Sequence, residues 1–273
     1  MKHTIESGNP KHPVPTMRVS PFLTSRLGLR PIVNHSISSI GAIRIIDFTG
    51  SCRLLPINDQ ATQFLGLDAG NSKTGKQLKA YLNPRGLGLD AIVAYALSHG
   101  HSDHVGALHV SPGVPAYMGK GDIPILNGTI PSPGKIPGRI DKARALINLS
   151  GAAVVPDVEP FPLEDGESRK FGQIGVRAFA MPGHTAGSMG LFVTRGRHDM
   201  QGDFYAGDTL DIDVNGDVVS AAKGATEDVY QSEMAIVGIA KRIRGEHIRI
   251  DTLMPAHSGD GLGEALMHFA PSV

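Results

Sequence analysis

The sequence predicts an α/β fold in which two β-sheets pack face to face and helices cover their outer sides. Three observations lead to this prediction. Short apolar and β-branched runs separated by Gly, Pro, Asn and Asp occur in both halves of the chain, and each half also has segments with helical spacing. The third observation is size, since 273 residues suffice for one large α/β domain. Sheets and helices of this kind bury their apolar faces by packing in layers.

The first half is predicted to be mostly sheet, because its apolar runs are short and bounded by turn residues. We expect strands within residues 36–48, 51–57, 62–70 and 90–98. Between the third and fourth strands, one helical face carries Leu78, Tyr81 and Leu82, and Pro84 and Gly86 should end that helix. The last run, DAIVAYALS, is almost entirely apolar, which is typical of a buried strand.

The middle of the chain, residues 111–138, is rich in Gly and Pro and is interpreted as either a lid or an ordered surface loop. Residues 139–151 then show helical spacing. The second half predicts strands again, followed by a helix from Thr226 to Arg244 with Thr226 as its N-cap and Gly245 as its stop. The strands are expected at residues 175–182, 188–195, 203–207 and 248–255.

Composition limits the kinds of partner and compartment. Lys plus Arg and Asp plus Glu number 26 each, so no strong field favours nucleic acid or an anionic membrane. The single Cys52 cannot form an internal disulfide, and no apolar run resembles a signal or membrane segment. We therefore expect a cytoplasmic protein with no nucleic-acid or membrane partner, and we make no prediction of its oligomeric state. Residues 1–21 are expected to form a loose arm before a single domain over residues 22–273.

The stretch HGHSDH concentrates side chains that bind metals, namely His99, His101, Asp103 and His104. On a helix or a strand these side chains would point in different directions, so their convergence requires a tight loop. Imidazole nitrogens and carboxylate oxygens are the usual non-sulfur ligands of Zn²⁺ and also suit Fe and Mn. A solvated polar turn is the alternative, but such crowding is costly without a cation. The stretch therefore predicts half of a metal site.

HGHSDH matches the HxHxDH signature of the metallo-β-lactamase fold superfamily, which this chain resembles from about residue 37 to its end. Three further motifs follow in that family's order, each after a predicted strand: His184 in PGHTAGS, Asp208 in YAGD and His257 in MPAHSG. The resemblance implies a four-layer αβ/βα sandwich with the site at one edge between the sheets. This agrees with the two-sheet fold predicted from the residues alone.

The resemblance also implies roles for seven residues. The ligands of one metal ion would be His99, His101 and His184. Those of a second ion would be Asp103, His104 and His257, and Asp208 would bridge the two. Two divalent ions, zinc first with manganese or iron as alternatives, would supply a bridging hydroxide by lowering the pKa of water from 15.7 to about 7. Asp103 and Asp208 are also expected to be catalytic, because either carboxylate could accept a proton.

Several branches of the family fit poorly. An aspartate at position 208 disfavours the β-lactamases with Cys at the equivalent position. The 23 residues between His184 and Asp208 are too few for the insertion of the nucleic-acid-cleaving β-CASP branch, and the 16 after His257 are too few for the helical domain of glyoxalase II-like thioesterases. Lactonases are similar in size and ligands, although they usually have a Tyr shortly after the bridging Asp, whereas Tyr205 precedes it here. We therefore expect hydrolysis of a small ester, with a lactone or another acyl ester favoured.

Three further functions are consistent with the sequence. A mononuclear iron dioxygenase acting on persulfides would use fewer of the seven ligands, a phosphodiesterase would use the same set, and a binding module would have a vestigial site. Asp68 is expected behind the ligand loop, with a structural turn as the alternative. Candidates for substrate contact are Tyr117, Lys120 and Lys223, although a solvent-exposed surface role is favoured for each of them.

Overall fold

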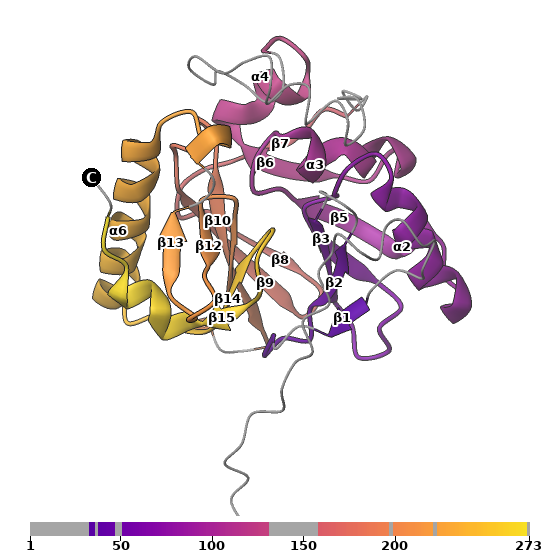
Figure 1. The fold of residues 1–273 in the computed structure, drawn as a ribbon. Helices are drawn as coiled ribbons and strands as arrows, with labels where there is room; N and C mark the ends of the chain where they lie inside the picture. Colours follow the sequence, from indigo (N-terminus) through magenta and orange to yellow (C-terminus); the bar gives the residue numbers. More distant parts are fainter. Residues whose placement is uncertain are drawn as a thin grey trace, which may run out of the picture. The chain divides into compact units, whose positions relative to one another are not determined.

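The computed structural model describes residues 33–35, 38–46, 51–130, 158–196, 199–220 and 223–271, and its strands form two large sheets and one small one (Figure 1). The first sheet has seven strands in chain order: β1 (Val33–His35), β2 (Ile43–Ile46), β3 (Ser51–Pro56), β4 (Phe64–Leu67), β5 (Ile92–Ala96), β6 (Ala116–Gly119) and β7 (Phe161–Leu163). Strands β1 to β4 pair antiparallel, whereas β4 to β7 pair parallel. The parallel strands therefore end at the same edge.

The second sheet has six strands in the order β15 (Gly261–Leu262), β14 (Arg249–Pro255), β11 (Gln201–Gly207), β10 (Met189–Arg195), β9 (Ile174–Ala180) and β8 (Ser168–Phe171). Strands β11 and β14 are parallel neighbours, so the segments that follow them also emerge side by side. A small hairpin of β12 (Leu210–Ile212) and β13 (Val218–Ser220) follows β11.

Helices cover the outer faces of both sheets. The α-helices among the described residues are α2 (Thr74–Leu82), α3 (Ser102–Val105), α4 (Ile123–Leu126) and α6 (Val229–Gly245). The 3₁₀ helices are η2 (Asn83–Arg85), η3 (Leu89–Ala91), η4 (Gly106–Val110), η5 (Lys120–Asp122), η6 (Lys223–Ala225) and η7 (Gly263–His268). In Figure 1, α2 and α6 lie on opposite sides with both sheets between them. In the described part of the chain, no helix is both long and apolar enough to cross a membrane.

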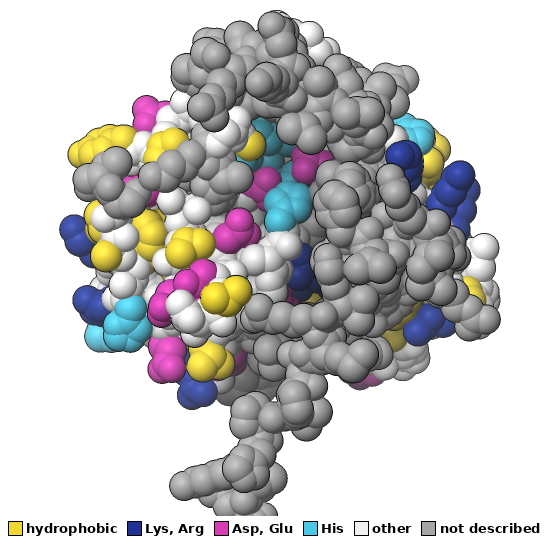
Figure 2. Space-filling view, in the orientation of Figure 1, with side chains coloured by type: hydrophobic (Ala, Val, Ile, Leu, Met, Phe, Trp, Pro, Cys, Tyr) yellow, Lys and Arg dark blue, Asp and Glu magenta, His cyan; other side chains and the backbone are white. Residues whose placement is uncertain are grey.

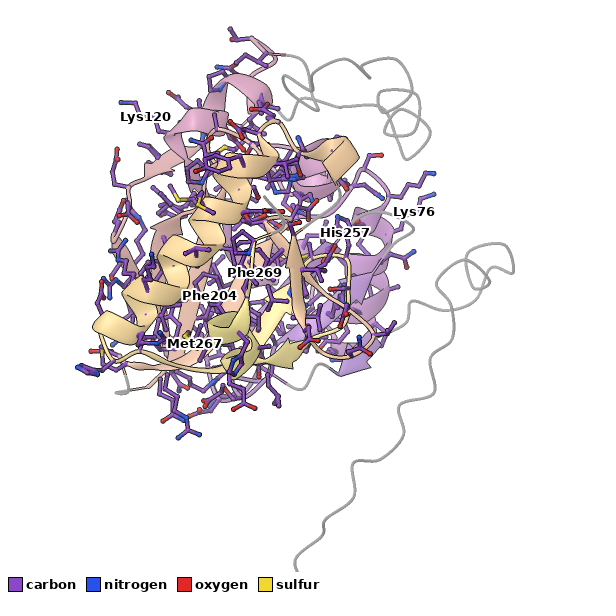
Figure 3. All side chains as sticks on the ribbon, turned by 60° about the vertical axis from the view of Figure 1, so that its left-hand side comes forward. Lys76, Lys120, Phe204, His257, Met267 and Phe269 are labelled. Carbon is purple, nitrogen blue, oxygen red and sulfur yellow. The ribbon has the colours of Figure 1, made fainter. Side chains whose placement is uncertain are left out.

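Three apolar clusters hold these layers together. Between the sheets, Leu65 and Leu67 of β4 pack in one cluster with Leu191 and Val193 of β10. Outside the first sheet, α2 contributes Leu78, Tyr81 and Leu82 to a cluster with Leu54 and Phe64. Outside the second sheet, α6 contributes Ile236, Ile239 and Ile243 to a cluster with Phe192 and Phe204 (Figure 3). The predicted four-layer αβ/βα sandwich is confirmed, because one cluster joins the two sheets and the other two join each sheet to its outer helix.

Most predicted elements are present, but two differ. The segment at 111–138 contains β6, η5 and α4 up to Leu126, so this part is not a plain loop; residues 131–138 lie outside the described residues, and the lid stays a prediction. The helix predicted from Thr226 begins at Val229, because the side chain of Asp228 accepts the N–H of Gln231 and caps it. The arm at 1–21 and the helix at 139–151 also lie outside the described residues, so they and the domain boundary stay predictions.

Candidate metal centre

Seven histidine and aspartate side chains converge where strands of both large sheets end, at the edge between the sheets. Strand β5 leads into the loop and short helix at residues 97–105, and β9, β11 and β14 are followed by His184, Asp208 and His257. The turn after β4 adds Asp68, whose φ of +55° is uncommon for a residue with a side chain. Figure 2 shows histidine and acidic side chains gathered at one place on this face. Residues far apart in sequence thus form one polar site.

The first group of ligand atoms belongs to His99, His101, His184 and Asp208, whose donor atoms all lie within 4.8 Å of one another. His101 Nδ1 is 3.1 Å from His184 Nε2, and His99 Nε2 is 3.9 Å from Asp208 Oδ2. The three imidazoles are buried. They approach edge to face with centroids 4.6 to 4.7 Å apart, which aims their ring nitrogens at a common point.

The second group consists of Asp103, His104, Asp208 and His257, again with donor atoms within 4.8 Å of one another. Asp208 faces both groups, because its Oδ1 lies 3.2 Å from His104 Nε2 of the second group while its Oδ2 lies 3.6 Å from His184 Nε2 of the first. His257 Nε2 is also 3.6 Å from Asp103 Oδ2. The seven predicted residues are therefore all brought together, with Asp208 shared between the groups.

Unsatisfied polar atoms show that these groups fit divalent cations. Among the described side chains, His99 Nε2, His104 Nε2 and Asp208 Oδ1 are buried and lack a hydrogen-bond partner. Buried polar atoms are normally paired, and three unpaired ones in a single site require something to bind them. All three face into the two groups, and a set of imidazole nitrogens with carboxylate oxygens suits Zn²⁺, with Mn²⁺ and Fe²⁺ also compatible.

Burial keeps two histidines of the first group unprotonated. Burial, followed by the neighbouring His104, holds the pKa of His99 well below its usual value. Burial and the adjacent His101 lower the pKa of His184 to about 3. Both rings are therefore unprotonated at neutral pH, as a metal ligand must be.

The second group is dominated by its carboxylates. Burial lowers the pKa of His104, but Asp208 and Asp103 outweigh it and hold this pKa well above its usual value. Burial raises the pKa of Asp208, but His104 and His257 outweigh it and hold this pKa well below its usual value. The pKa of His257 is raised, chiefly by Asp208. This group therefore stabilises positive charge, which a proton or a metal cation can supply.

Asp68 fixes the orientation of two of the histidines. Its carboxylate accepts His104 Nδ1 at 2.6 Å, the backbone N–H of Ser98 at 2.6 Å and the hydroxyls of Ser98 and Tyr205 at 2.7 and 2.5 Å. Because the Ser98 hydroxyl donates to Asp68, its oxygen accepts His99 Nδ1 at 3.0 Å. Both rings then present Nε2 to the site, so Asp68 lies behind the ligand loop as expected.

We expect Asp68→Asn to weaken zinc binding by about 10- to 100-fold, the usual effect of losing such a partner. An amide at this position faces four donors with only one acceptor oxygen, so His104 loses its fixed orientation. A competition titration against a chromogenic zinc chelator measures the change. Asp165→Asn is the control, because Asp165 is an exposed partner of Arg242 at 2.7 Å. Equal zinc affinity in both variants would contradict this role of Asp68.

Thr226 has a role that local sequence did not suggest. Its hydroxyl lies 3.2 Å from His184 Nδ1, and the neighbouring backbone N–H groups of Glu227 and Asp228 donate to the carbonyls of His184 and Gly183. The predicted N-cap thus orients a ligand histidine instead, and Asp228 caps the helix.

Two buried arginines from the first sheet hold the loop that carries His257. Arg44 donates to the carbonyls of Ser258 at 2.5 Å and Ala256. Arg53, which is fully buried, donates to the carbonyl of Pro255 at 2.9 Å and pairs with Asp260 at 2.5 Å. Sequence reasoning missed both residues, although a charge inside the apolar runs AIRII and CRLL is a usable signal, because buried charges need partners.

The predicted substrate contacts are not supported in the described part of the chain. Tyr117 stacks on Phe161 with ring centroids 5.3 Å apart and also meets Phe171. Lys120 is exposed and points away from His257 in Figure 3. The side chain of Lys223 is not among those described.

Comparisons with known proteins agree with this geometry. A model of the metallo-beta-lactamase superfamily matches residues 67–236. A B3 metallo-β-lactamase with an active-site glutamic acid is 17% identical, with a TM-score of 0.58, over 92% of this chain and 91% of that chain. BJP-1, a subclass B3 enzyme of Bradyrhizobium japonicum, is 16% identical with a TM-score of 0.55, over 84% and 78% of the two chains. These identities show a shared fold alone. A search of curated proteins finds no match.

Proposed function

The chain belongs to the metallo-β-lactamase superfamily and is a metal-dependent hydrolase, and we propose that it cleaves a small ester, with a lactone or another acyl ester favoured. The observation that carries this proposal is the pair of His/Asp groups that share Asp208 and leave three buried donor atoms unpaired between them. An aspartate at this shared position also disfavours the β-lactamases that have a cysteine there.

Each residue of the site has a proposed task. The first ion is assigned to His99, His101 and His184. The second is assigned to Asp103, His104 and His257, with Asp208 binding both. Two divalent cations held by these residues would lower the pKa of a water, so that it is a nucleophile at neutral pH, and would polarise the ester carbonyl. Zinc is favoured, with manganese or iron as alternatives.

Proton transfer falls to the carboxylates. The side chains of Asp103 and Asp208 are 17% and 12% exposed, so both are partly accessible from solvent. Either one can accept the proton released as the nucleophile attacks and deliver it to the leaving alkoxide. Tyr205 takes no part in substrate contact, because its hydroxyl already donates to buried Asp68.

A second candidate substrate is a β-lactam, because B3 metallo-β-lactamases share this fold over most of the chain. A mononuclear iron dioxygenase receives less support, because it leaves Asp103, His104 and His257 without a task although their donor atoms converge.

The test is metal content together with chelator-sensitive hydrolysis. Protein purified without added metal should contain about two zinc or manganese atoms per chain by elemental analysis, and it should hydrolyse at least one member of a panel of lactones, acyl esters, β-lactams and phosphodiesters. Removing the metal with a chelator should reduce hydrolysis to background, and zinc should restore it. About one iron per chain with oxygen uptake on a persulfide would overturn the proposal.

A further inference from the structure

Asp122 carries a buried carboxylate that belongs to neither ligand group but contacts both loops of the first one. It ends η5 and is fully buried. Although it occupies the N-cap position of α4, its side chain makes no bond to that helix. An aspartate at an N-cap usually accepts a backbone N–H of its own helix, so its carboxylate is used elsewhere.

Three donors from two distant segments meet this carboxylate. Its Oδ2 accepts the backbone N–H of Gly100 at 2.7 Å and the Thr185 hydroxyl at 2.6 Å. Its Oδ1 accepts the backbone N–H of Gly187 at 2.6 Å. Gly100 lies between His99 and His101, while Thr185 directly follows His184. One side chain therefore connects the backbones that carry all three histidines of the first group.

Close backbone approach makes this connection rigid. A Cβ on Gly187 would lie 2.3 Å from the Asp122 nitrogen, and a Cβ on Gly121 would lie 2.8 Å from the backbone of Ala186. A Cβ on Gly119 would lie 2.1 Å from the carbonyl oxygen of Gly187. Such distances are too short for any larger residue, so glycine on both sides lets the segments at 119–122 and 185–188 touch.

We propose that Asp122 is a positioning residue for the metal ion held by His99, His101 and His184. The inference rests on the proposed function, since it assumes that these histidines bind a metal. Within the described residues, the hydrogen bonds of the Asp122 carboxylate go to Gly100, Thr185 and Gly187 and to no ligand of the second ion, so the effect is confined to one of the two ions. A carboxylate with three donors is a stronger constraint than a neutral group, because each bond is charge-assisted.

The matched pair of variants is Asp122→Asn and Asp203→Asn. Asparagine keeps the shape at position 122, but whichever way its amide turns, its NH₂ group faces at least one backbone N–H. Asp203 is also fully buried and accepts three donors, the hydroxyls of Ser38 and Ser39 and the N–H of Ile40. It lies five residues before Asp208, about 16 Å along β11. The control therefore loses similar bonds away from the site.

Zinc is the probe, measured by competition with a chromogenic chelator, and thermal unfolding of the metal-free proteins is the second readout. We expect both variants to unfold at lower temperature than the wild type. Only Asp122→Asn should weaken the binding of one zinc ion, by about 10- to 100-fold, while the other ion changes by less than about threefold. Thr185→Ser should keep wild-type zinc affinity. The zinc affinity of Thr185→Val should lie between those of the wild type and Asp122→Asn.

Two results overturn the inference and are distinguishable from each other. If the wild type binds two zinc ions and Asp122→Asn binds both with the affinity of Asp203→Asn, Asp122 has no positioning role although the proposed function stands. If the wild type binds no zinc, the proposed function fails and the inference fails with it. Should Asp122→Asn not fold, wild-type affinity in Thr185→Val for both ions would contradict the inference.

Discussion

Asp208→Asn is expected to reduce kcat/KM for the hydrolysed ester by at least about 10³-fold, comparable to or larger than the loss of a single transition-state donor in other hydrolases. Asp208 is the shared member of both ligand groups, with Oδ1 3.2 Å from His104 Nε2 and Oδ2 3.6 Å from His184 Nε2. An amide presents one acceptor oxygen and no charge, so the two groups lose their common ligand together. His184→Ala should have an effect of similar size by removing a ligand from the first group.

Both variants should remain folded, because the three apolar clusters do not include these side chains. Far-UV circular dichroism checks this, and zinc content by elemental analysis shows whether an ion is lost. Asp211→Asn is the matched control: this carboxyl lies three residues downstream, burial raises its pKa, and it belongs to neither ligand group. If Asp208→Asn keeps kcat/KM within about tenfold of the control, the shared-ligand mechanism is wrong.

Of the seven ligand-type residues, the four in HGHSDH stand out from the residues themselves, whereas His184, Asp208 and His257 are identified through motifs that resemble the metallo-β-lactamase superfamily. Asp103 and His104 share a loop with His99, and His184, Asp208 and His257 follow apolar runs that local spacing identifies. The strand ends then meet because β4 to β7 are parallel and β11 pairs parallel with β14. Local pattern therefore predicts half of this site, and the other three ligands depend on the motifs that resemble the family.

The residues that orient the ligands could not be predicted in the same way. Asp122 reaches Gly187 across 65 positions, and Arg44 reaches Ala256 across 212. Such partners depend on how the two sheets are packed, which no local pattern contains. Thr226 shows the same limit at short range, since both it and Asp228 are suitable N-caps and only the position of His184 decides between them.

Arg53→Met is expected to lower the free energy of unfolding of the metal-free protein by about 3–5 kcal/mol, since it leaves a buried carboxylate without its partner. The side chains of Arg53 and Asp260 are 0% and 5% exposed, and their N–O distance is 2.5 Å. Urea denaturation measures the loss. Removing both charges in Arg53→Met/Asp260→Leu should recover part of it, because an apolar pair can replace a buried ion pair of similar volume.

The same substitution also tests how the loop after β14 is held. Without Arg53, the carbonyl of Pro255 loses its donor. Of the two buried arginines, Arg44 is then the one that still holds the loop of His257. Zinc binding should weaken for the ion that His257 contacts, and the double variant should not restore it, because the missing bond is to backbone. If the double variant recovers stability and zinc affinity together, the ion pair matters only for folding and Arg53 does not position His257.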